Sequence, residues 1–465
     1  MKNRIITIIL SGGSGSRLWP SSRLSFPKQF IEFREGVTLF GNTVKRIDAN
    51  QDIHFTIVSN KAHNFLCRRE LSKLGREASY ILEEVGRNTA PAILMAALNA
   101  SEDDTLLIMP ADHWIEDTNA FNQNIHTASK IASSEDSWVT FGVNPTEPQT
   151  GYGYIQATSE GTKRSVMSFT EKPDLKTAER YLAEGNYFWN SGIFVVRAQK
   201  CIQSFKQYQP ELYEAAKECW DNREINEDEI TLRKVYLEKI PSISVDYAIL
   251  EKEENIVLVP FEGQWSDLGS WDSLSKLIEA DNSNMYTSNN TVQIDTKNTF
   301  IHSSSRTIAS VGVEDLIIVD DDNATLIVQK GQSEKVKDAL EVLKRLNIPA
   351  AREHSFEFRP WGMFENLLDS AICKVKRLTV NPGHHLSLQY HQKRSEHWVV
   401  VQGRATVQMK DETLYLDPGQ SIDIPLGTQH ALGNDTDEDV IVIEVQMGSY
   451  FGEDDIVRVS DPYNR

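Results

Sequence analysis

The chain has 465 residues, of which 40% are hydrophobic, and its formal net charge is -19. A chain of this length is too long to fold around a single ordinary hydrophobic core, so we expect two or three globular domains. The negative charge argues against a nucleic-acid partner, because binding a polyanion requires a basic face. No apolar run approaches the length of a membrane-spanning segment, so no membrane partner is expected.

The chain has few cysteines, and their spacing matches no metal-binding or redox motif. There are four cysteines: Cys67, Cys201, Cys219 and Cys373. None is two residues from another, as zinc-ribbon and redox motifs require, so free thiols in a reducing compartment are favoured. The six apolar residues 5–10 are too few for a signal peptide. We therefore expect a cytoplasmic protein.

A glycine-rich turn follows the apolar run 5–10. It contains Gly12, Gly13 and Gly15, and it is followed by three cationic residues, Arg17, Arg23 and Lys28. Glycines can adopt positive φ and have no Cβ atom, so backbone N–H groups can approach an anion closely. The spacing excludes a Walker loop and also a dinucleotide fingerprint, which needs a glycine where Leu18 stands. The stretch predicts a phosphate-binding loop with all three cations within reach.

Strand-like and helix-like segments alternate after this turn. Segments 55–59, 105–109 and 138–143 have strand patterns, and 62–74 has a helical pattern. This alternation predicts a mostly parallel sheet covered by helices. Ligands bind such sheets at the carboxyl ends of the strands, where the glycine-rich turn would lie.

The stretch Gly86 to Pro91 precedes an apolar helix predicted over 92–100. Asn88 or Thr89 can cap this helix, and proline is tolerated in a first helical turn. An ordinary helix start is one interpretation. A nucleotide-binding role is the other, because a helix N-terminus offers free N–H groups and the positive end of the helix dipole.

Two aspartates are candidates for holding Mg²⁺. Asp112 directly follows the predicted strand 105–109, and Asp267 lies in the glycine- and tryptophan-rich stretch 263–271. Mg²⁺ prefers carboxylate and phosphate oxygens, so an acid beside a phosphate loop suits it. A lone loop acid such as Asp267 is, by itself, more often solvated.

Three stretches between these acids suit a sugar phosphate: 151–154, which contains Gly153, then 169–173, and 189–192, which precedes a strand predicted over 193–197. A sugar phosphate needs hydrogen-bond partners for its hydroxyls and a cation for its phosphate. Glu171, Asn190 and Lys172 can supply these. An adjacent Glu-Lys pair is, on its own, usually a solvated surface.

The pattern changes after residue 289 to short β-branched strands. They are expected at 291–294, 299–301, 307–311, 316–319 and 325–328, and they form either a small sheet or a few coils of β-helix. An amphipathic helix beginning at Ser333 then presents one apolar face made of Val336, Ala339, Leu340, Leu343 and Leu346. Residues 348–357 are predicted to be a linker.

The region 373–447 is again rich in strand patterns, and its spaced Gly, His and Glu residues look like two cupin motifs in a small β-barrel. Gln389 and His391 are two apart in a strand and share a face. With Glu396 and His430 they form a ligand set suited to Zn²⁺ or a similar divalent ion, such as Co²⁺. A structural or dimerising role without metal is the alternative.

The motif Gly12-Gly13-Ser14-Gly15-Ser16-Arg17-Leu18-Trp19-Pro20-Ser21-Ser22-Arg23, with Pro27-Lys28-Gln29-Phe30, resembles the mannose-1-phosphate guanylyltransferases. The resemblance implies synthesis of GDP-mannose and diphosphate from GTP and α-D-mannose 1-phosphate with Mg²⁺. It implies that Arg17 and Lys28 balance the phosphate charges and that Asp112 and Asp267 hold Mg²⁺. The implied nucleotide ligands are Gly12, Gly13, Asn88 and Thr89, and the implied sugar-phosphate ligands are Gly153, Glu171, Lys172 and Asn190. Without the resemblance, a nucleotidyltransferase using another base or hexose fits the same residues.

The C-terminal region resembles the type II mannose-6-phosphate isomerase domain often fused to this transferase. It departs from that pattern at Tyr390, Gln392 and Lys393, which leaves open an isomerase activity or a barrel used for binding or dimerisation alone. The resemblance also implies a homodimer. The expected fold is α/β, with a Rossmann-like nucleotidyltransferase domain (1–283), a short β-helix-like region (284–349) and a C-terminal cupin barrel (350–465).

Overall fold

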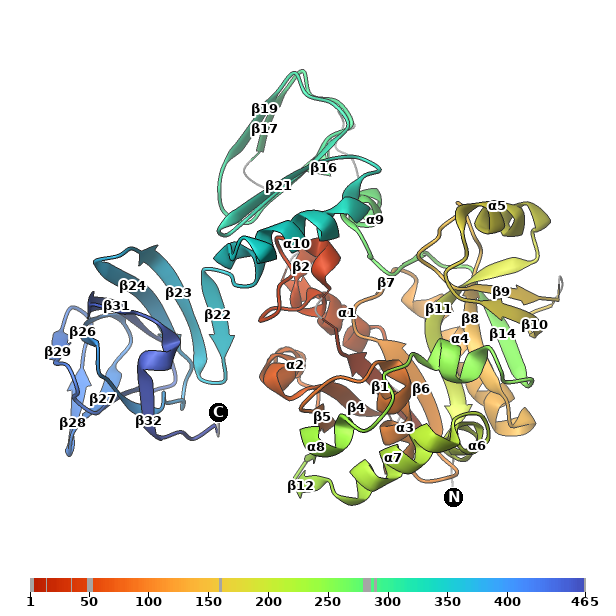
Figure 1. Ribbon diagram of the computed structural model, residues 1–465, viewed down its shortest axis with the longest axis horizontal. Coiled ribbons are helices and arrows are strands. Elements are labelled where there is room, and N and C mark those ends of the chain that lie inside the picture. Colours follow the sequence, from red (N-terminus) through yellow and green to blue (C-terminus); the bar gives the residue numbers. More distant parts are fainter. Residues whose placement is uncertain are drawn as a thin grey trace.

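The computed structural model describes residues 4–13, 15–34, 36–47, 53–158, 161–278, 286–287 and 291–463. Figure 1 shows an α/β unit that contains the N-terminus, a stack of short strands above it, and a blue C-terminal β unit beside it. Within the described ranges, no helix is long and apolar enough to cross a membrane.

The N-terminal unit is built around an 11-stranded sheet ordered β12-β13-β5-β4-β1-β6-β11-β8-β14-β10-β9. The strands are β1 (Ile5–Ser11), β4 (Ile53–Asn60), β5 (Ala78–Glu83), β6 (Thr105–Pro110), β8 (Trp138–Val143), β9 (Tyr154–Ala157), β10 (Arg164–Thr170), β11 (Tyr187–Arg197), β12 (Glu224–Asn226), β13 (Glu229–Leu232) and β14 (Ile256–Phe261). Small two-stranded pairs join β2 (Glu32–Arg34) to β3 (Val37–Thr38) and β7 (Trp114–Ile115) to β15 (Trp265–Ser266).

The strand directions correct the expectation of a mostly parallel sheet. Strands β13, β5, β4, β1 and β6 run parallel, and so do β8 and β14. However, β11 pairs antiparallel with β6 and β8, and β10 pairs antiparallel with β14 and β9. The prediction was wrong for the part of the sheet that runs from β11 to β9. A strand buried on both faces has the same apolar pattern in either direction, so the sequence does not show which way it runs.

Helices cover both faces of the sheet. They are α1 (Leu39–Lys45), α2 (Asn64–Lys73), α3 (Thr89–Asn99), α4 (Thr118–Glu135), α5 (Leu175–Glu184), α6 (Ala198–Tyr208), α7 (Pro210–Asp221), α8 (Lys234–Leu237) and α9 (Trp271–Leu277), with short turns η1 (Ser16–Leu18), η2 (Lys28–Phe30), η3 (Lys61–His63) and η4 (Asp246–Leu250). The adjacent residues Ile8 and Ile9 of β1 are both fully buried, yet they belong to different hydrophobic clusters. Successive side chains of a strand point to opposite faces, so one cluster packs under α3, α6 and α7 and the other under α2 and α4.

The middle of the chain is β-helix-like. Its strands are β16 (Tyr286–Thr287), β17 (Thr291–Ile294), β18 (Phe300–Ser303), β19 (Ile308–Val311), β20 (Leu316–Asp321) and β21 (Ala324–Gln329). Parallel stacking of β16 on β18 on β20, and of β17 on β19, distinguishes coils from a hairpin sheet. After η5 (Ser333–Lys335), helix α10 (Val336–Arg345) buries Val336 and Leu340, whereas Ala339 and Leu346 of the predicted apolar face are exposed.

Residues 348–357 are not a free linker, and that prediction was wrong. The segment contains η6 (Pro349–Ala351), and the Trp19 indole donates a hydrogen bond to the Ala350 carbonyl at 2.9 Å. Ser355 bonds to the Asp322 carboxylate. These contacts join residues 331 and 33 positions apart, and no local pattern reveals either of them.

The C-terminal unit consists of two antiparallel sheets packed face to face, and we call it the C-terminal barrel. One sheet contains β22 (Phe356–Arg359), β23 (Gly362–Asp369), β24 (Cys373–Val380), β31 (Val440–Gly448), β26 (Arg394–Gln402) and β29 (Ser421–Ile424). The other contains β28 (Glu412–Leu416), β27 (Ala405–Met409), β30 (His430–Gly433), β25 (Leu388–His391) and β32 (Ile456–Ser460), with η7 (Glu453–Asp455) before β32. Apolar side chains from both sheets, such as Val442 and Leu432, form one core. Strand β22 faces the N-terminal unit (Figure 1), where the Arg69 guanidinium of α2 lies 3.9 Å from the Phe358 ring centre.

Candidate functional site

The glycine-rich turn lies at the carboxyl end of β1. Gly13 and Gly15 have φ values of 87° and 59°, in the left-handed region that glycine tolerates. A Cβ atom on Gly15 would collide with the Lys28 side chain. The turn and Lys28 are therefore packed directly against each other, as a phosphate loop with its cation requires.

The four residues predicted to be catalytic line one cleft of about 250 Å³. They are Arg17, Lys28, Asp112 and Asp267. The Lys28 ammonium donates to Asp112 Oδ2 at 2.9 Å and also to the backbone carbonyl of Asp267. Lys28 thus holds the end of β6 and the loop 267–269 together beside the glycine-rich turn.

The two aspartates are presented as carboxylates. Burial favours the neutral form of Asp112, but the charge and hydrogen bond of Lys28 outweigh burial and lower the pKa of Asp112. Asp267 Oδ1 accepts hydrogen bonds from the Tyr152 hydroxyl at 2.8 Å and from Gly269 N–H at 2.9 Å. A Cβ atom on Gly269 would lie 2.7 Å from Asp267 Oδ2, so the absence of a side chain at 269 leaves room for the carboxylate. Two such groups in one cleft fit a hard divalent cation such as Mg²⁺.

The predicted sugar-phosphate residues form a second group. A Cβ atom on Gly153 would lie 2.5 Å from Glu171 Oε2 and 3.3 Å from Asn190 Cβ, so the bare backbone of Gly153 approaches both side chains. Lys172 pairs with Glu171 and has a φ of 47°, which is unusual for a non-glycine residue. Asn190 does not precede its strand as predicted. It lies inside β11, where the pairing with β8 becomes irregular between Asn190 and Phe194.

Tyr152 connects the two groups. Its hydroxyl bonds to Asp267, and its carbonyl accepts the Lys172 N–H at 3.2 Å. Its ring packs edge-on against Trp189 and Trp265, with ring centres 5.1 Å and 5.3 Å away. A second cavity, of about 540 Å³, is also lined by Tyr152, Arg17 and Asp267, so the cleft continues past this tyrosine.

Sequence reasoning missed Asp246. This residue begins η4, and its Oδ1 accepts a hydrogen bond from Asn190 Nδ2 at 2.9 Å. Burial, together with the nearby charge of Glu171, raises the pKa of Asp246 to about 6. No glycine, turn or strand-end signal marks Asp246 in the sequence. The sequence also did not predict that Tyr152 contacts Asp267, although the stretch 151–154 that contains this tyrosine is one of the candidate sugar-phosphate stretches.

Arg23 corrects the expectation of a third cation at the turn. Its Nη1 donates to Asn323 Oδ1 at 2.6 Å and to the Glu353 carbonyl, and its Nε donates to the Pro20 carbonyl at 3.1 Å. The residue is 2% exposed. Arg23 is therefore committed to joining the turn to the β-helix region, because its Nε and Nη1 donors are taken by protein oxygens and the side chain is buried.

Asn88 and Thr89 start α3 at the carboxyl end of β5, two strands from β1 on the same edge. Asn88 Oδ1 accepts the Thr89 N–H at 2.8 Å, and Thr89 Oγ1 accepts the Val245 N–H at 2.9 Å. Neither residue lines the cleft that holds Lys28. A nucleotide-binding role for this pair stays a prediction.

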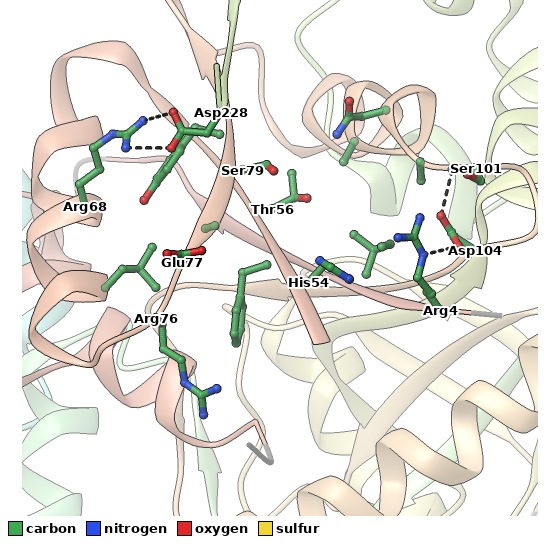
Figure 2. Close-up of a pocket in the computed structure, with 18 of the residues that line it drawn as sticks. Arg4, His54, Thr56, Arg68, Arg76, Glu77, Ser79, Ser101, Asp104 and Asp228 are labelled. Carbon is green, nitrogen blue, oxygen red and sulfur yellow. Dashed lines mark hydrogen bonds and ion pairs between the residues drawn. The ribbon is translucent and has the colours of Figure 1, made fainter. Parts of the chain in front are cut away.

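A cavity of about 1340 Å³ lies at the opposite, amino-terminal edge of the sheet (Figure 2). Two ion pairs line it: Arg68 binds Asp228 through two hydrogen bonds of 2.9 and 3.0 Å, and Arg4 lies 3.7 Å from Asp104. It is therefore far from the strand ends that carry Asp112 and the turn, and we do not assign chemistry to it.

The C-terminal barrel holds a separate cluster of His391, Glu396 and His430. Their candidate ligand atoms all lie within 4.8 Å of one another, and each residue is at most 2% exposed. Glu396 Oε1 is 3.0 Å from His391 Nε2, and Glu396 Oε2 is 3.5 Å from His430 Nε2. Gln389 pairs directly with His430 in the ladder, so its side chain lies on the same face.

The donor set of this cluster suits a divalent metal. His430 Nδ1 is 2.8 Å from the Thr428 carbonyl, an outer contact that directs Nε2 toward Glu396. Burial opposes charge on both Glu396 and His430, but the attraction of the Glu396 carboxylate to His391 and His430 outweighs burial. The pKa of Glu396 is therefore held well below its usual value and that of His430 is raised. Both ring nitrogens of His391 and Nε2 of His430 are buried without a hydrogen-bond partner in the described part of the chain, as befits atoms available to a ligand.

Comparisons with known proteins agree with this division of the chain. A family model described as nucleotidyl transferase matches residues 6–284, one described as MannoseP isomerase/GMP-like beta-helix domain matches 289–346, and one described as mannose-6-phosphate isomerase C-terminal matches 347–461. The xanthan biosynthesis protein XanB of Xanthomonas campestris pv. campestris (strain B100) is 41% identical, and a mannose-1-phosphate guanylyltransferase of Escherichia coli is 37% identical. These matches cover 99% of this chain and 99% and 100% of those proteins. A solved structure described as a mannose-1-phosphate geranyltransferase from Thermus thermophilus is 29% identical with a TM-score of 0.65, covering 74% of this chain and 99% of that chain.

Proposed function

The chain belongs to the nucleotidyl transferase family, and from this membership and its full-length relatives we propose that it makes GDP-mannose and diphosphate from GTP and α-D-mannose 1-phosphate. Relatives named for xanthan and alginate biosynthesis support the use of this product in polysaccharide synthesis. The observation that carries the proposal is the convergence of Arg17, Lys28, Asp112 and Asp267 on one cleft beside the glycine-rich turn.

The reaction is a displacement at the α-phosphorus of GTP. A phosphate oxygen of mannose 1-phosphate forms the new P–O bond, and the bond between the α-phosphorus and the bridging oxygen breaks to release diphosphate. The nucleophile is already an anion, so alignment and charge neutralisation account for most of the catalysis. No general base is required.

Each charged residue of the cleft contributes to charge neutralisation according to its place in the cleft. Arg17 is exposed at the mouth of the cleft, where its charge can reach the triphosphate and the leaving diphosphate. Lys28 lies deeper, between the two aspartates. Asp112 and Asp267 would hold Mg²⁺, which supplies further positive charge to the phosphate oxygens when bound.

Glu171 would accept hydrogen bonds from the sugar hydroxyls and Asn190 would donate one; the closeness of both side chains to the Gly153 backbone supports this assignment. Lys172 offers a cation for the sugar phosphate. Gly12 and Gly13 are exposed and would offer backbone N–H groups to the nucleotide phosphates. Asn88 and Thr89 are proposed for the guanine nucleotide by resemblance, on the same edge of the sheet.

A diphosphate-release assay tests the proposal. With mannose 1-phosphate and Mg²⁺, we expect GTP to support turnover well above ATP, UTP, CTP and dTTP. The Arg17→Ala variant should lose activity by about 10²-fold or more, because it removes charge stabilisation of the phosphates. The matched control is Arg180→Ala, which removes an exposed arginine from α5, outside the cleft. Near-normal GDP-mannose synthesis by folded Arg17→Ala would refute the assignment.

The buried barrel cluster favours a second candidate activity. We propose that Gln389, His391, Glu396 and His430 hold Zn²⁺ or Co²⁺, and that the barrel interconverts fructose 6-phosphate and mannose 6-phosphate. A bound cation would polarise the sugar carbonyl. Metal analysis of the full chain and a coupled isomerase assay with each ion test this idea; a metal-free barrel without turnover would leave it a binding or dimerising module.

We also propose a homodimer in the cytoplasm. The four cysteines are free thiols, and burial raises the pKa of Cys67 to about 12, which keeps that thiol unreactive. Unpaired thiols and nucleotide substrates suit a reducing compartment. Light scattering of the purified chain would give twice the monomer mass for a dimer.

A further inference from the structure

Helix α1 places two hydrogen-bond donors against the turn that carries Asp112. Thr43 lies in the last turn of α1, and Arg46 follows three residues later, directly after the helix ends. Residues three apart on a helix are neighbours on one face. The Thr43 hydroxyl donates to the Ala111 carbonyl at 3.3 Å, and Arg46 Nη2 donates to the His113 carbonyl at 2.6 Å. The backbone is therefore held on both sides of Asp112.

The backbone beyond His113 leads to the second carboxylate of the cleft. It forms β7, which pairs antiparallel with β15, and Asp267 directly follows β15. The His113 ring also packs edge-on against Trp265 of β15, with ring centres 5.5 Å apart. The place of His113 therefore bears on the end of β15, and through it on the position of Asp267 relative to Asp112.

Arg46 occupies a position that packing alone does not explain. The residue is 3% exposed, and its guanidinium carbon lies 5.7 Å from the centre of the Phe121 ring. Among the described residues, no carboxylate forms an ion pair with Arg46, and its Nε and Nη1 are buried without a hydrogen-bond partner. Burial lowers the pKa of Arg46 to about 9, so the group stays charged at neutral pH. A buried charge without an ion pair costs stability, whereas an apolar side chain would pack there without that cost.

We propose that Thr43 and Arg46 are positioning residues that set the separation of Asp112 and Asp267, and we call the pair the α1 clamp. Neither residue lines the cleft, so the clamp acts through the two backbone carbonyls that it holds. The inference rests on the proposed function, because it takes the two aspartates as the groups that would hold Mg²⁺.

The clamp should matter more for Mg²⁺ than for a larger cation. Mg²⁺ requires nearly ideal octahedral geometry with short bonds to oxygen, whereas Ca²⁺ accepts longer bonds and a flexible arrangement. A small shift of one carboxylate therefore weakens Mg²⁺ binding first. Loss of a purely structural contact would weaken the binding of both cations alike.

Calorimetric titration of the full chain with Mg²⁺ alone, and with Ca²⁺ alone, tests the clamp without turnover. Asp267→Asn identifies the binding heat that belongs to the cleft. We expect Arg46→Met to weaken Mg²⁺ binding at that site by about 10-fold, the usual effect of removing a group that orients a metal ligand. Ca²⁺ binding should weaken less.

Arg223→Met is the matched control. Arg223 Nη1 also donates to a backbone carbonyl, that of Trp220, at 2.6 Å, and its guanidinium carbon also lies near a ring, 4.3 Å from the centre of the Trp220 indole. It directly precedes β12 at the outer edge of the sheet, away from the cleft. Its removal should leave Mg²⁺ binding unchanged.

Thr43→Val tests the clamp even where Arg46→Met does not fold, because it nearly keeps the side-chain shape and removes only the hydroxyl. We expect the Mg²⁺ affinity to fall by about 2- to 10-fold, the value of one ordinary hydrogen bond. Thr43→Ser keeps the hydroxyl and should bind Mg²⁺ more tightly than Thr43→Val.

Steady-state kinetics separate the clamp from the proposed reaction. In Arg46→Met, kcat for GDP-mannose formation should fall at low Mg²⁺ and recover as Mg²⁺ is raised, while the KM for mannose 1-phosphate stays near the wild-type value. A wild type that binds Mg²⁺ in the cleft but makes no GDP-mannose would refute the proposed function, and cation binding would still decide the clamp.

Three results would overturn the clamp. They are a wild type without Mg²⁺ heat that Asp267→Asn removes, equal Mg²⁺ affinity in Arg46→Met and Arg223→Met, and an equal loss of Mg²⁺ and Ca²⁺ affinity in Arg46→Met. Where Arg46→Met does not fold, unchanged Mg²⁺ affinity in Thr43→Val overturns it instead.

Discussion

Both the transferase cleft and the barrel cluster place carboxylates beside cationic or titratable nitrogen groups. The two sites differ in how exposed these side chains are to solvent. In the cleft, the Arg17 and Asp112 side chains are 46% and 33% exposed. In the barrel, the side chains of His391, Glu396 and His430 are at most 2% exposed. The cleft is open to ligands that bring their own charge, whereas the barrel balances its charges internally.

The difference follows from the elements that carry the residues. The cleft residues stand on loops after β1, β6 and β15, where side chains converge without being enclosed. The barrel residues stand on or next to strands whose pairing fixes which face each side chain occupies. Removing a charge should therefore harm turnover in the cleft and folding in the barrel.

The largest expected effect is on the stability of the metal-free barrel. Glu396→Ala leaves two buried histidines and the donors Trp398 Nε1 and Gln446 Nε2 without their carboxylate. Breaking a buried ion pair by deleting one partner costs about 3–5 kcal/mol. Hydrogen exchange should show faster opening of β24, β26 and β31, while β1, β4 and β6 stay protected in the same chain.

Glu412→Ala, on the exposed face of β28, is the control for this variant and should leave exchange unchanged. If Glu396→Ala exchanged no faster than Glu412→Ala, Glu396 would not balance the buried histidines as we describe, and the contrast with the cleft would fail.

The next effect is on turnover in the cleft. Asp267→Asn keeps an oxygen for Tyr152 and Gly269 but removes the charge that would hold Mg²⁺. We expect the rate of GDP-mannose formation to fall by about 10²- to 10³-fold with little change in melting temperature. Steady-state kinetics across a magnesium titration measure it, and Glu262→Gln, an exposed acid on the same segment, is the control. If Asp267→Asn lost much of its stability but kept normal turnover, the cleft would behave as we expect of the barrel, and the comparison would be wrong.

The smallest effect concerns Asp246, the buried acid behind the sugar-phosphate group. It acts as a positioning residue through Asn190. Asp246→Ala removes the acceptor of the Asn190 amide, so it should raise the KM for mannose 1-phosphate by about 2- to 10-fold, the value of one ordinary hydrogen bond, and leave kcat nearly unchanged. An unchanged KM would show that Asp246 does not position Asn190 for binding mannose 1-phosphate.

The pH dependence of Asp246 supplies a second readout. Its folded pKa of about 6 lies above the ordinary value of 3.8, so ionisation opposes folding, and this cost grows as the pH rises from about 4 through 6. Asp246→Asn removes the cost. The variant should therefore gain melting temperature over the wild type at pH 7.5 and lose that gain at pH 4. Parallel melting curves at both pH values would contradict the burial assigned to this group.

Local sequence already identified much of the molecule. The glycine-rich turn, Asp112 at a strand end, the short strands after residue 289 and the spaced His and Glu residues of the barrel all follow from short-range patterns, because backbone geometry and strand periodicity are local properties. The choice of β-helix coils over a small sheet needed the parallel strand pairing of the structure. The family resemblance then assigned roles to Arg17, Lys28 and Asp267, which the structure brings into one cleft.

Tertiary structure alone decided the rest. It turned Arg23 away from the phosphate loop toward Asn323, 300 residues later in the chain, and it placed Asp246 behind Asn190. It also set the antiparallel direction of β11 and placed Arg46 against the His113 carbonyl. These features depend on which distant surfaces meet and on which buried charges find a partner there, and neither property is contained in a local pattern of residues.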